Sequence, residues 1–170
     1  LLASGAEVVG WDSADSTRAR FADRIRLADP LDIPLEGYAA VIVSPGVPLN
    51  RHPIAARAAA AGVPVIGDIE LFAQARPDLP PHRVIGITGT NGKTTVTSLT
   101  GQLLEHAGLT VGVAGNIGPS LLDTLSARID AQDLPQAWVL ELSSFQLDGV
   151  QGFEPTAATV LNITQDHLDW

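Results

Sequence analysis

One short stretch of the sequence combines glycines, a lysine and threonines in an order that could bind a phosphate group. Gly89-Thr90-Asn91-Gly92-Lys93-Thr94-Thr95 follows an apolar run and precedes a segment with helical spacing. The glycines let backbone N–H groups curl around an anion, and the start of a helix adds the positive end of its dipole. Lys93 supplies a mobile positive charge for the β- and γ-phosphates of a nucleotide, and Thr94 can be a ligand of Mg²⁺. We therefore predict a phosphate-binding loop here.

The context of this stretch decides how specific the prediction is. The strict phosphate-loop pattern requires a glycine where this sequence has Ile87, so only the shorter Gly-x-x-Gly-Lys-Thr form fits. The alternative is a tight strand–helix turn that contains glycine and lysine without binding anything. A strand expected at 84–88 and a helix expected at 93–107 favour the phosphate loop, because the motif requires both. Lys93 is also the sole lysine among 10 basic residues.

A phosphate loop predicts a partner acid at the end of a neighbouring apolar strand, where it can help to hold Mg²⁺. An apolar run ends at Glu141, and we expect Glu141 to bind the metal together with Thr94. The alternative is that Glu141 faces solvent on an edge strand. Ser143 and Gln146 follow in the same segment, and they fit a site or an ordinary turn equally well.

Further polar residues lie just after other expected strands. Asp12 and Ser13 follow the first strand, Gly46 the second, Asn116 the strand at 110–114, and His167 the last one. Open parallel sheets bind ligands at the carboxyl ends of their strands, so each of these residues is a candidate for a binding site. From the residues alone, Asp12 and Ser13 also fit an ordinary cap, and His167 also fits a solvated loop residue.

Apolar runs alternate with helical segments along the whole chain, which predicts an α/β fold with parallel sheets covered on both faces. The expected strands are 7–11, 39–43, 63–66, 84–88, 110–114, 137–142 and 157–163, and the expected helices are 53–61, 69–75, 93–107 and 120–127, with a short helix or loop at 16–23. Asp68 is expected to cap the helix at 69–75.

The chain is expected to contain two domains. Three prolines within residues 77–81 fit neither a helix nor a central strand, so we expect a linker at 77–82. Residues 1–76 are then a Rossmann-like parallel-sheet domain, incomplete at its start. Residues 83–170 are the first part of a P-loop α/β ATPase domain, incomplete at its end. Both ends are abrupt, and we expect a piece of a longer protein.

Composition excludes several classes of function. With 10 basic against 19 acidic residues the net charge is −9, which argues against binding the backbone of a nucleic acid. The absence of cysteine excludes disulfides, thiolate zinc sites and cysteine nucleophiles. No apolar run approaches the roughly 20 residues that a membrane span requires, so none is expected. A hydrophobic content of 45% supports a packed core rather than disorder.

Four motifs together resemble the Mur ligases, the ATP-dependent amino-acid ligases of peptidoglycan assembly. These motifs are residues 89–95, 115–118, 141–147 and 162–169. Two further segments, 44–48 and 67–72, resemble the branch of the family that adds D-glutamate to UDP-N-acetylmuramoyl-L-alanine. The resemblance covers essentially the whole chain. It implies the UDP-substrate domain of the family at 1–76 and its central ATP-binding domain from residue 83.

The resemblance also implies cofactors and residue roles. ATP and Mg²⁺ would be required, and the reaction would pass through an acyl phosphate in a cytoplasmic monomer. ATP would be bound by Gly89, Thr90, Asn91, Gly92, Lys93, Thr94 and Thr95. The catalytic residues would be Lys93, Glu141 and His167, and the metal ligands Thr94, Glu141 and His167. The substrate would be bound by Asp12, Ser13, Gly46, Asn116 and His167. Ala14 stands where relatives often carry an arginine, which departs from the family pattern near the uracil.

Other functions stay open at this point. The phosphate loop alone also fits another Mur-type or folylpolyglutamate-type ligase. A P-loop switch or kinase would need a guanine-reading or lid segment, which the sequence does not show. A third possibility is a nucleotide-binding module without turnover, and for the 170 residues by themselves we expect no activity because parts of the family's catalytic machinery lie outside them.

Overall fold

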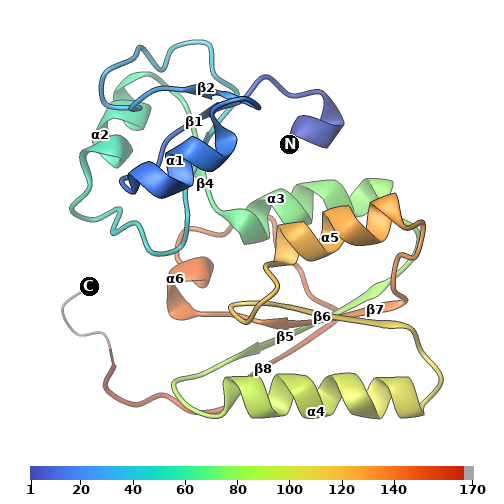
Figure 1. The fold of residues 1–170 in the computed structure, drawn as a ribbon. Coiled ribbons are helices and arrows are strands. Elements are labelled where there is room, and N and C mark those ends of the chain that lie inside the picture. Colours follow the sequence, from blue (N-terminus) through green and yellow to red (C-terminus); the bar gives the residue numbers. More distant parts are fainter. Residues whose placement is uncertain (167–170) are drawn as a thin grey trace. The chain divides into compact units, whose positions relative to one another are not determined.

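The computed structural model describes residues 1–166, and the chain divides into two compact units (Figure 1). The first unit contains residues 1–41 and 49–65. The second contains residues 42–48 and everything from residue 66 onward. No helix within the described residues is both long enough and apolar enough to span a membrane.

Short strands and helices alternate in the first part of the chain. In order they are η1 (Leu2–Ser4), β1 (Val9–Gly10), α1 (Asp15–Phe21), β2 (Arg26–Leu27), β3 (Val41–Ile42), α2 (Pro53–Ala60) and β4 (Val65–Ile66). β1 pairs with β2 in parallel, and β3 and β4 form a second two-stranded sheet. Pro53 opens α2 because its missing N–H is not needed in the first turn. The sequence predicts β1, β3, α2 and β4, and it leaves the segment that contains α1 open between a short helix and a loop. β2 is not among the expected strands.

The second unit is built around a four-stranded sheet. Its elements are α3 (Asp68–Ala75), η2 (Arg76–Asp78), β5 (Arg83–Thr88), α4 (Lys93–His106), β6 (Val111–Gly115), α5 (Leu121–Asp130), β7 (Ala137–Glu141), α6 (Ser144–Leu147) and β8 (Ala157–Val160). The strand order is β6-β7-β5-β8, and all three pairs are parallel. The predicted α/β class with parallel sheets is confirmed. β7 and β5 are the two central strands, so their carboxyl ends meet in the middle of the sheet edge.

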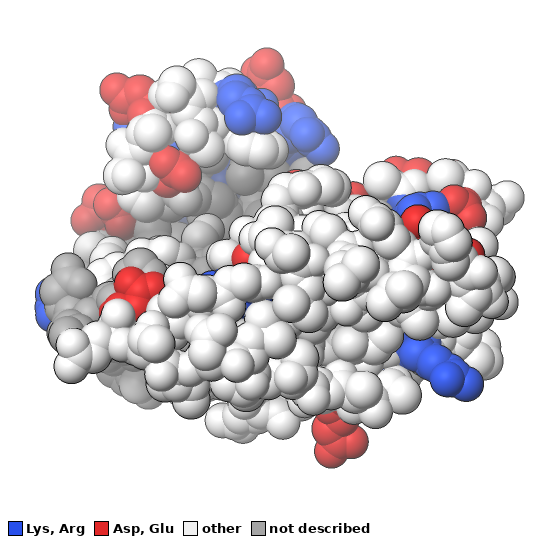
Figure 2. Space-filling model, turned by 90° about the horizontal axis from the view of Figure 1, so that it is seen from below, with Lys and Arg blue, Asp and Glu red and all other residues white. Residues whose placement is uncertain are grey.

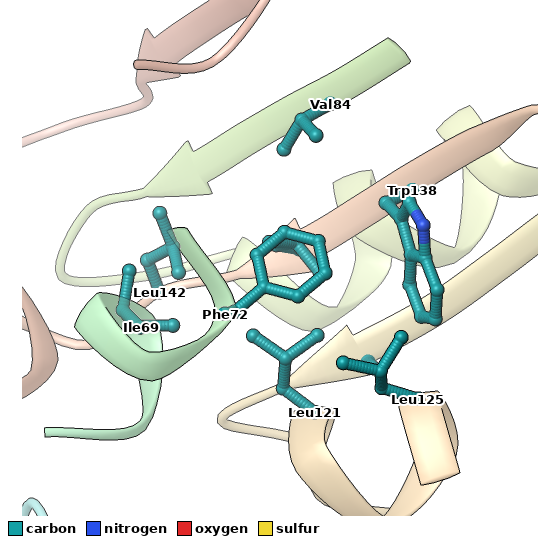
Figure 3. Close-up of a cluster of buried hydrophobic side chains, with 9 residues drawn as sticks. Ile69, Phe72, Val84, Leu121, Leu125, Trp138 and Leu142 are labelled. Carbon is teal, nitrogen blue, oxygen red and sulfur yellow. The ribbon is translucent and has the colours of Figure 1, made fainter. Parts of the chain in front are cut away.

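Helices cover both faces of this sheet. α4 lies on one face, and α3 and α5 lie on the other (Figure 1). The side chains between the sheet and the α3–α5 layer form the main core (Figure 3), which contains Ile69, Phe72, Val84, Ala114, Leu121, Leu125, Trp138, Leu140 and Leu142. Because Ile69 and Phe72 belong to this core, α3 packs with the second unit although it precedes the proline-rich segment. That segment begins with the 3₁₀ turn η2.

The fully buried residues of α4 are small, and the partly buried Val96 and Leu104 pack against the sheet beside them. Thr97 and Gly101 are buried, whereas the side chains of Leu99 and Leu103 are 52% and 62% exposed. A Cβ at Gly101 would lie 2.7 Å from Cγ2 of Val113 on β6, so only glycine allows the helix to approach the sheet this closely. The apolar spacing predicts the helix, but part of it faces outward. On the α4 side the second unit carries few charged side chains (Figure 2).

Asp68 does not cap α3 as the sequence predicts. Gly67 is the N-cap residue, and Asp68 is the first residue of the helix with no side-chain capping bond. Its Oδ2 instead accepts a hydrogen bond from Nε2 of Gln146 at 2.8 Å. The capping prediction is therefore wrong, because a tertiary partner on α6 takes the carboxylate away from the amides of its own helix.

Trp138 anchors the main core, and its removal should destabilise the second unit. Its side chain is 1% exposed and meets Phe72 edge to face, with ring centroids 5.5 Å apart. We expect Trp138→Ala to lower the free energy of unfolding by about 3–5 kcal/mol, since truncating a buried tryptophan loses its contacts and leaves a cavity. Urea unfolding measures this change. Trp11, which is 46% exposed, provides the control, and an equal loss in Trp11→Ala would contradict the assignment of Trp138 to the core.

Glu70 on α3 ties that helix to the loop after α6. Its Oε2 accepts the backbone N–H groups of Gln151 at 3.0 Å and Gly152 at 2.9 Å. These hydrogen bonds, that from Gly152 first, hold the pKa of Glu70 below its ordinary value. A depressed folded-state pKa means that the stabilisation is present above the unfolded-state pKa and is lost as the pH falls through the folded-state pKa.

Replacing Glu70 with glutamine should therefore destabilise the protein in a pH-dependent way. At pH 7 we expect the Tm of Glu70→Gln to be lower by about 2–4 °C, which corresponds to about 1 kcal/mol in a chain of this size. The difference should shrink in acid, because the wild-type carboxylate is then protonated as well. Thermal unfolding between pH 7 and pH 3 measures it, with the exposed Glu105→Gln on α4 as control. A difference that stays constant over this range would rule out the carboxylate as its cause.

Candidate functional site

The phosphate loop predicted from the sequence connects β5 to α4. β5 ends at Thr88, and α4 begins at Lys93 with Gly92 as its N-cap. Gly92 has a φ of 82°, a left-handed conformation that glycine adopts without strain. The first hydrogen bond of the helix runs from the N–H of Val96 to the carbonyl of Gly92. The N–H groups of Lys93, Thr94 and Thr95 therefore have no acceptor within the helix, and they are available to an anion.

Lys93 folds back over this loop. Its Nζ donates to the carbonyl oxygens of Gly89 at 2.8 Å and Thr90 at 3.2 Å. The ammonium group thus lies on the loop itself and is held by neutral acceptors. Such an ammonium can exchange its carbonyl partners for phosphate oxygens, because a charge-assisted hydrogen bond to an anion is roughly twice as strong as one between neutral groups.

Three of the predicted site residues meet beside the loop. The Thr94 hydroxyl donates to Oε2 of Glu141 at 2.7 Å, and Nδ2 of Asn116 donates to Oε1 of the same carboxylate at 3.0 Å. Glu141 is 2% exposed and closes the central strand β7. The interpretation of Glu141 as a solvent-facing residue on an edge strand is therefore wrong. The structure instead places a buried carboxylate next to the threonine of the phosphate loop.

A close approach of two strand ends brings Asn116 to Glu141. Gly115 ends β6 with a φ of 114°, and a Cβ on it would lie 2.1 Å from the carbonyl oxygen of Glu141. Only glycine fits in this space. The next residue, Asn116, then donates its backbone N–H to that same carbonyl at 2.8 Å. Backbone and side chain of Asn116 both bind Glu141, so the orientation of the carboxylate is fixed from the β6 side.

The oxygen atoms of Thr94 and Glu141 suit Mg²⁺, a hard cation that takes oxygen ligands. Glu141 has neither lysine nor arginine as a partner among residues 1–166, and a buried carboxylate is costly unless it is paired or binds a metal. The same residues hold no group of three or more His, Asp or Glu side chains that could bind a metal by themselves. Mg²⁺ here would take its remaining ligands from phosphate oxygens and water, as it commonly does.

The residues after Glu141 form a short helix that the sequence left undecided. α6 begins with a capping box, in which the Ser143 hydroxyl accepts the N–H of Gln146 at 3.1 Å and the Gln146 side chain accepts the N–H of Ser143 at 3.0 Å. Gln146 is buried and also binds Asp68, whose Oδ1 is buried without a partner in the described part of the chain. The Ser-x-x-Gln spacing is the signal that could have identified this helix start.

The remaining predicted residues lie apart from this cluster or outside the description. Asp12 and Ser13 follow β1 in the first unit, where Oδ1 of Asp12 accepts the N–H of Ala14 at 2.8 Å. Gly46 is exposed and lies in the segment 42–48 of the second unit. His167 lies outside the described residues. The structure therefore brings together Thr94, Glu141 and Asn116. The roles of the four residues named in this paragraph, from Asp12 to His167, stay predictions.

One residue of the site was not identified from the sequence. Asn162, two residues after the end of β8, binds the backbone of the phosphate loop through both its side chain and its main chain. It belongs to a motif of the family resemblance, but spacing alone assigned it no role. The contact depends on β8 lying next to β5, which the sequence does not specify.

Comparison with known proteins identifies the family of this chain. Residues 87–170 match the family model described as "Mur ligase middle domain". A "UDP-N-acetylmuramoylalanine--D-glutamate ligase" from Novosphingobium aromaticivorans is 54% identical over 99% of this chain, and one from Sphingopyxis alaskensis is 55% identical over 99%. A relative of the same name from Burkholderia thailandensis is 57% identical over 79% of the chain. The chain spans 37%, 38% and 28% of the lengths of these relatives.

A solved structure supports the fold. The UDP-N-acetylmuramate:L-alanyl-gamma-D-glutamyl-meso-diaminopimelate ligase from Neisseria meningitides superposes with a TM-score of 0.53 at 18% sequence identity, covering 97% of this chain and 55% of that one. At this identity the likeness concerns the fold alone. The motifs around the phosphate loop, the matched middle domain and the high identity to the curated relatives agree: the chain belongs to the Mur ligase family.

Proposed function

We propose that the protein containing this chain is an ATP-dependent ligase that joins D-glutamate to UDP-N-acetylmuramoyl-L-alanine in peptidoglycan synthesis. One structural observation supports the nucleotide chemistry most strongly, namely the 2.7 Å hydrogen bond between Thr94 of the phosphate loop and the buried carboxylate of Glu141. The names of the relatives, with identities of 54–57%, support the choice of substrates.

The proposal gives each part of the site a task. The loop at 89–95 binds ATP, with Lys93 and the free amides at the start of α4 holding its phosphates. Thr94 and Glu141 hold a Mg²⁺, which would supply positive charge to the phosphates when bound. Asn116 contacts the substrate near the reacting carboxylate. His167 is a ligand of a second Mg²⁺ and a contact of the substrate. These assignments rest on motif and geometry together.

In this proposal the uridine diphosphate end of the substrate is bound by the remaining predicted residues. Asp12 and Ser13 follow β1, and Gly46 lies in the loop after β3. Each of the three therefore lies just after a strand, where parallel sheets bind ligands. In this proposal residues 1–76 bind the UDP substrate and residues 83–170 bind ATP. The expected cytoplasmic location and monomeric state are part of the same proposal.

The proposed reaction has two steps. A carboxylate oxygen of the alanine attacks the γ-phosphorus of ATP, the bond to the β,γ-bridging oxygen breaks, and ADP leaves with the electron pair. The amine of D-glutamate then attacks the acyl carbon, loses a proton and displaces inorganic phosphate. Both partners of the first step are anions, so positioning and charge neutralisation by Lys93 and the loop amides are the main contributions that this chain can make.

A panel of amino acids tests the proposal. The protein containing this chain is incubated with ATP, Mg²⁺, UDP-N-acetylmuramoyl-L-alanine and one amino acid at a time, and phosphate release is followed. We expect release with D-glutamate alone. Release with L-lysine, meso-diaminopimelate or a folate substrate would assign the protein to a sister enzyme. ATP hydrolysis without any acceptor would instead favour a nucleotide switch.

A further inference from the structure

The middle of the phosphate loop is fastened to the segment that follows β8. The N–H groups of Thr90 and Asn91 donate to the backbone carbonyl of Asn162 at 3.0 Å and to its Oδ1 at 2.9 Å. In return, Nδ2 of Asn162 donates to the carbonyl of Asn91 at 2.9 Å. The Thr90 hydroxyl accepts the N–H of Thr164 at 3.0 Å and donates to its carbonyl at 3.3 Å. Figure 1 shows this segment running past the β5–α4 loop.

These five hydrogen bonds, which we call the loop clasp, occupy two amides of the phosphate loop. The N–H groups of Thr90 and Asn91 already have acceptors and cannot also donate to a phosphate. The anion must then be bound by the amides at the start of α4 and by Lys93. Thr90 and Asn91 contribute by their fixed position, and the residue that fixes them is Asn162.

Gly89 is shaped to allow this contact. Its φ is 141°, and a Cβ on it would lie 3.1 Å from both the backbone N and the backbone O of Asn162. That is tighter than nine in ten real Cβ contacts, and the atoms in question are backbone atoms that cannot turn away. Gly89 is therefore required because any larger residue would crowd the backbone of Asn162 in the clasp.

The clasp also explains how the loop keeps its shape when the lysine moves. Before nucleotide binds, Lys93 holds the carbonyls of Gly89 and Thr90. To reach phosphate oxygens, its ammonium group must leave these carbonyls, so the loop loses an internal support at the moment it has to hold the ligand. The hydrogen bonds to Asn162 and Thr164 do not involve Lys93 and remain in place.

We propose that Asn162 and the Thr90 hydroxyl are positioning residues that hold the phosphate loop in its nucleotide-binding conformation before the nucleotide arrives. The proposal rests on the proposed function, because it assumes that the loop binds the phosphates of ATP. A loop without the clasp samples other conformations. The apparent affinity for the nucleotide is then the intrinsic affinity multiplied by the fraction of molecules whose loop is in the competent conformation.

The test measures Mg·ATP affinity by isothermal titration calorimetry on the protein containing this chain. Asn162→Ala and Thr90→Val remove clasp hydrogen bonds, and we expect each to weaken binding roughly tenfold, as when the competent population falls to about a tenth. Thr90→Ser keeps the hydroxyl and should restore most of the affinity. Ile163→Ala is the matched control, because its side chain is 86% exposed between the two clasp residues. With saturating ATP the variants should keep their kcat and show a raised KM.

A second readout, hydrogen–deuterium exchange of the loop amides, needs no nucleotide. In the wild-type protein without nucleotide, the amides of Thr90 and Asn91 should exchange slowly with solvent deuterium, and Asn162→Ala should accelerate both. Fast exchange of these two amides in the wild type would overturn the clasp. Normal ATP affinity in Asn162→Ala and Thr90→Val, with binding lost in Lys93→Ala, would overturn the positioning role and leave the proposed function standing. Normal affinity in all three variants would overturn the proposed function itself.

Discussion

Replacing Lys93 with alanine should lower kcat/KM for ATP by roughly 10²–10³-fold, the usual cost of removing one preorganised group that stabilises charge in the transition state. Lys93 is the sole lysine of the sequence, so no neighbouring ammonium group can take its place. In the structure it supports the loop through the carbonyls of Gly89 and Thr90, so part of the loss should come from weaker nucleotide binding.

Phosphate release at varied ATP concentration measures both parts of this effect. Arg83→Ala is the matched control, because Arg83 is an exposed cation at the opposite end of the same strand, β5. It removes the same charge from the unit without touching the loop, and we expect less than a twofold change. A Lys93→Ala variant that kept both its affinity for ATP and its turnover would contradict the phosphate-loop assignment.

Replacing Glu141 with glutamine should abolish most activity without unfolding the protein. The amide keeps the size of the side chain and can still bind the Thr94 hydroxyl and the Asn116 amide, but it lacks the negative charge that attracts Mg²⁺. We expect turnover at a fixed Mg²⁺ concentration to fall by at least about 100-fold, judged from the losses of 10–100-fold seen when residues that merely support metal ligands are changed. More Mg²⁺ should restore part of it.

The same substitution should leave the Tm unchanged or raise it. Glu141 is 2% exposed and has no cationic partner among the described residues, and a buried unpaired charge is costly to the folded state. Higher stability with lower activity is characteristic of a residue kept for function. Asp148→Asn, an exposed carboxylate shortly after α6, is the control. Unchanged Mg²⁺ dependence in Glu141→Gln would exclude Glu141 as a metal ligand.

The sequence was sufficient to predict the strand and the helix on either side of the proposed phosphate loop. The apolar run before Gly89, the glycines and the helical spacing after Lys93 are local signals, and the structure has β5 and α4 where these signals place them. The same holds for β6 and β7, whose continuous apolar runs reflect burial on both faces, whereas β8 is exposed along its whole length.

Features that depend on contacts between distant segments could not be predicted. Whether Glu141 lies at the centre or the edge of the sheet is set by the strand order β6-β7-β5-β8, which no local pattern encodes. Asp68 is a residue type that commonly caps helices, but its carboxylate is bound by Gln146, which lies far along the chain. Leu99 and Leu103 follow the apolar spacing of α4 and yet face outward, because the close contact with β6 requires Gly101 on the inner side.

The central claim is that this phosphate loop serves amide-bond formation by activating a carboxylate. Labelling both carboxylate oxygens of UDP-N-acetylmuramoyl-L-alanine with ¹⁸O tests it most directly. After reaction with ATP, Mg²⁺ and D-glutamate, mass spectrometry of the released phosphate should find one ¹⁸O atom per phosphate, because the oxygen that attacks the γ-phosphorus leaves with it. Phosphate free of ¹⁸O would mean that water attacks the nucleotide, and it would contradict the ligase mechanism.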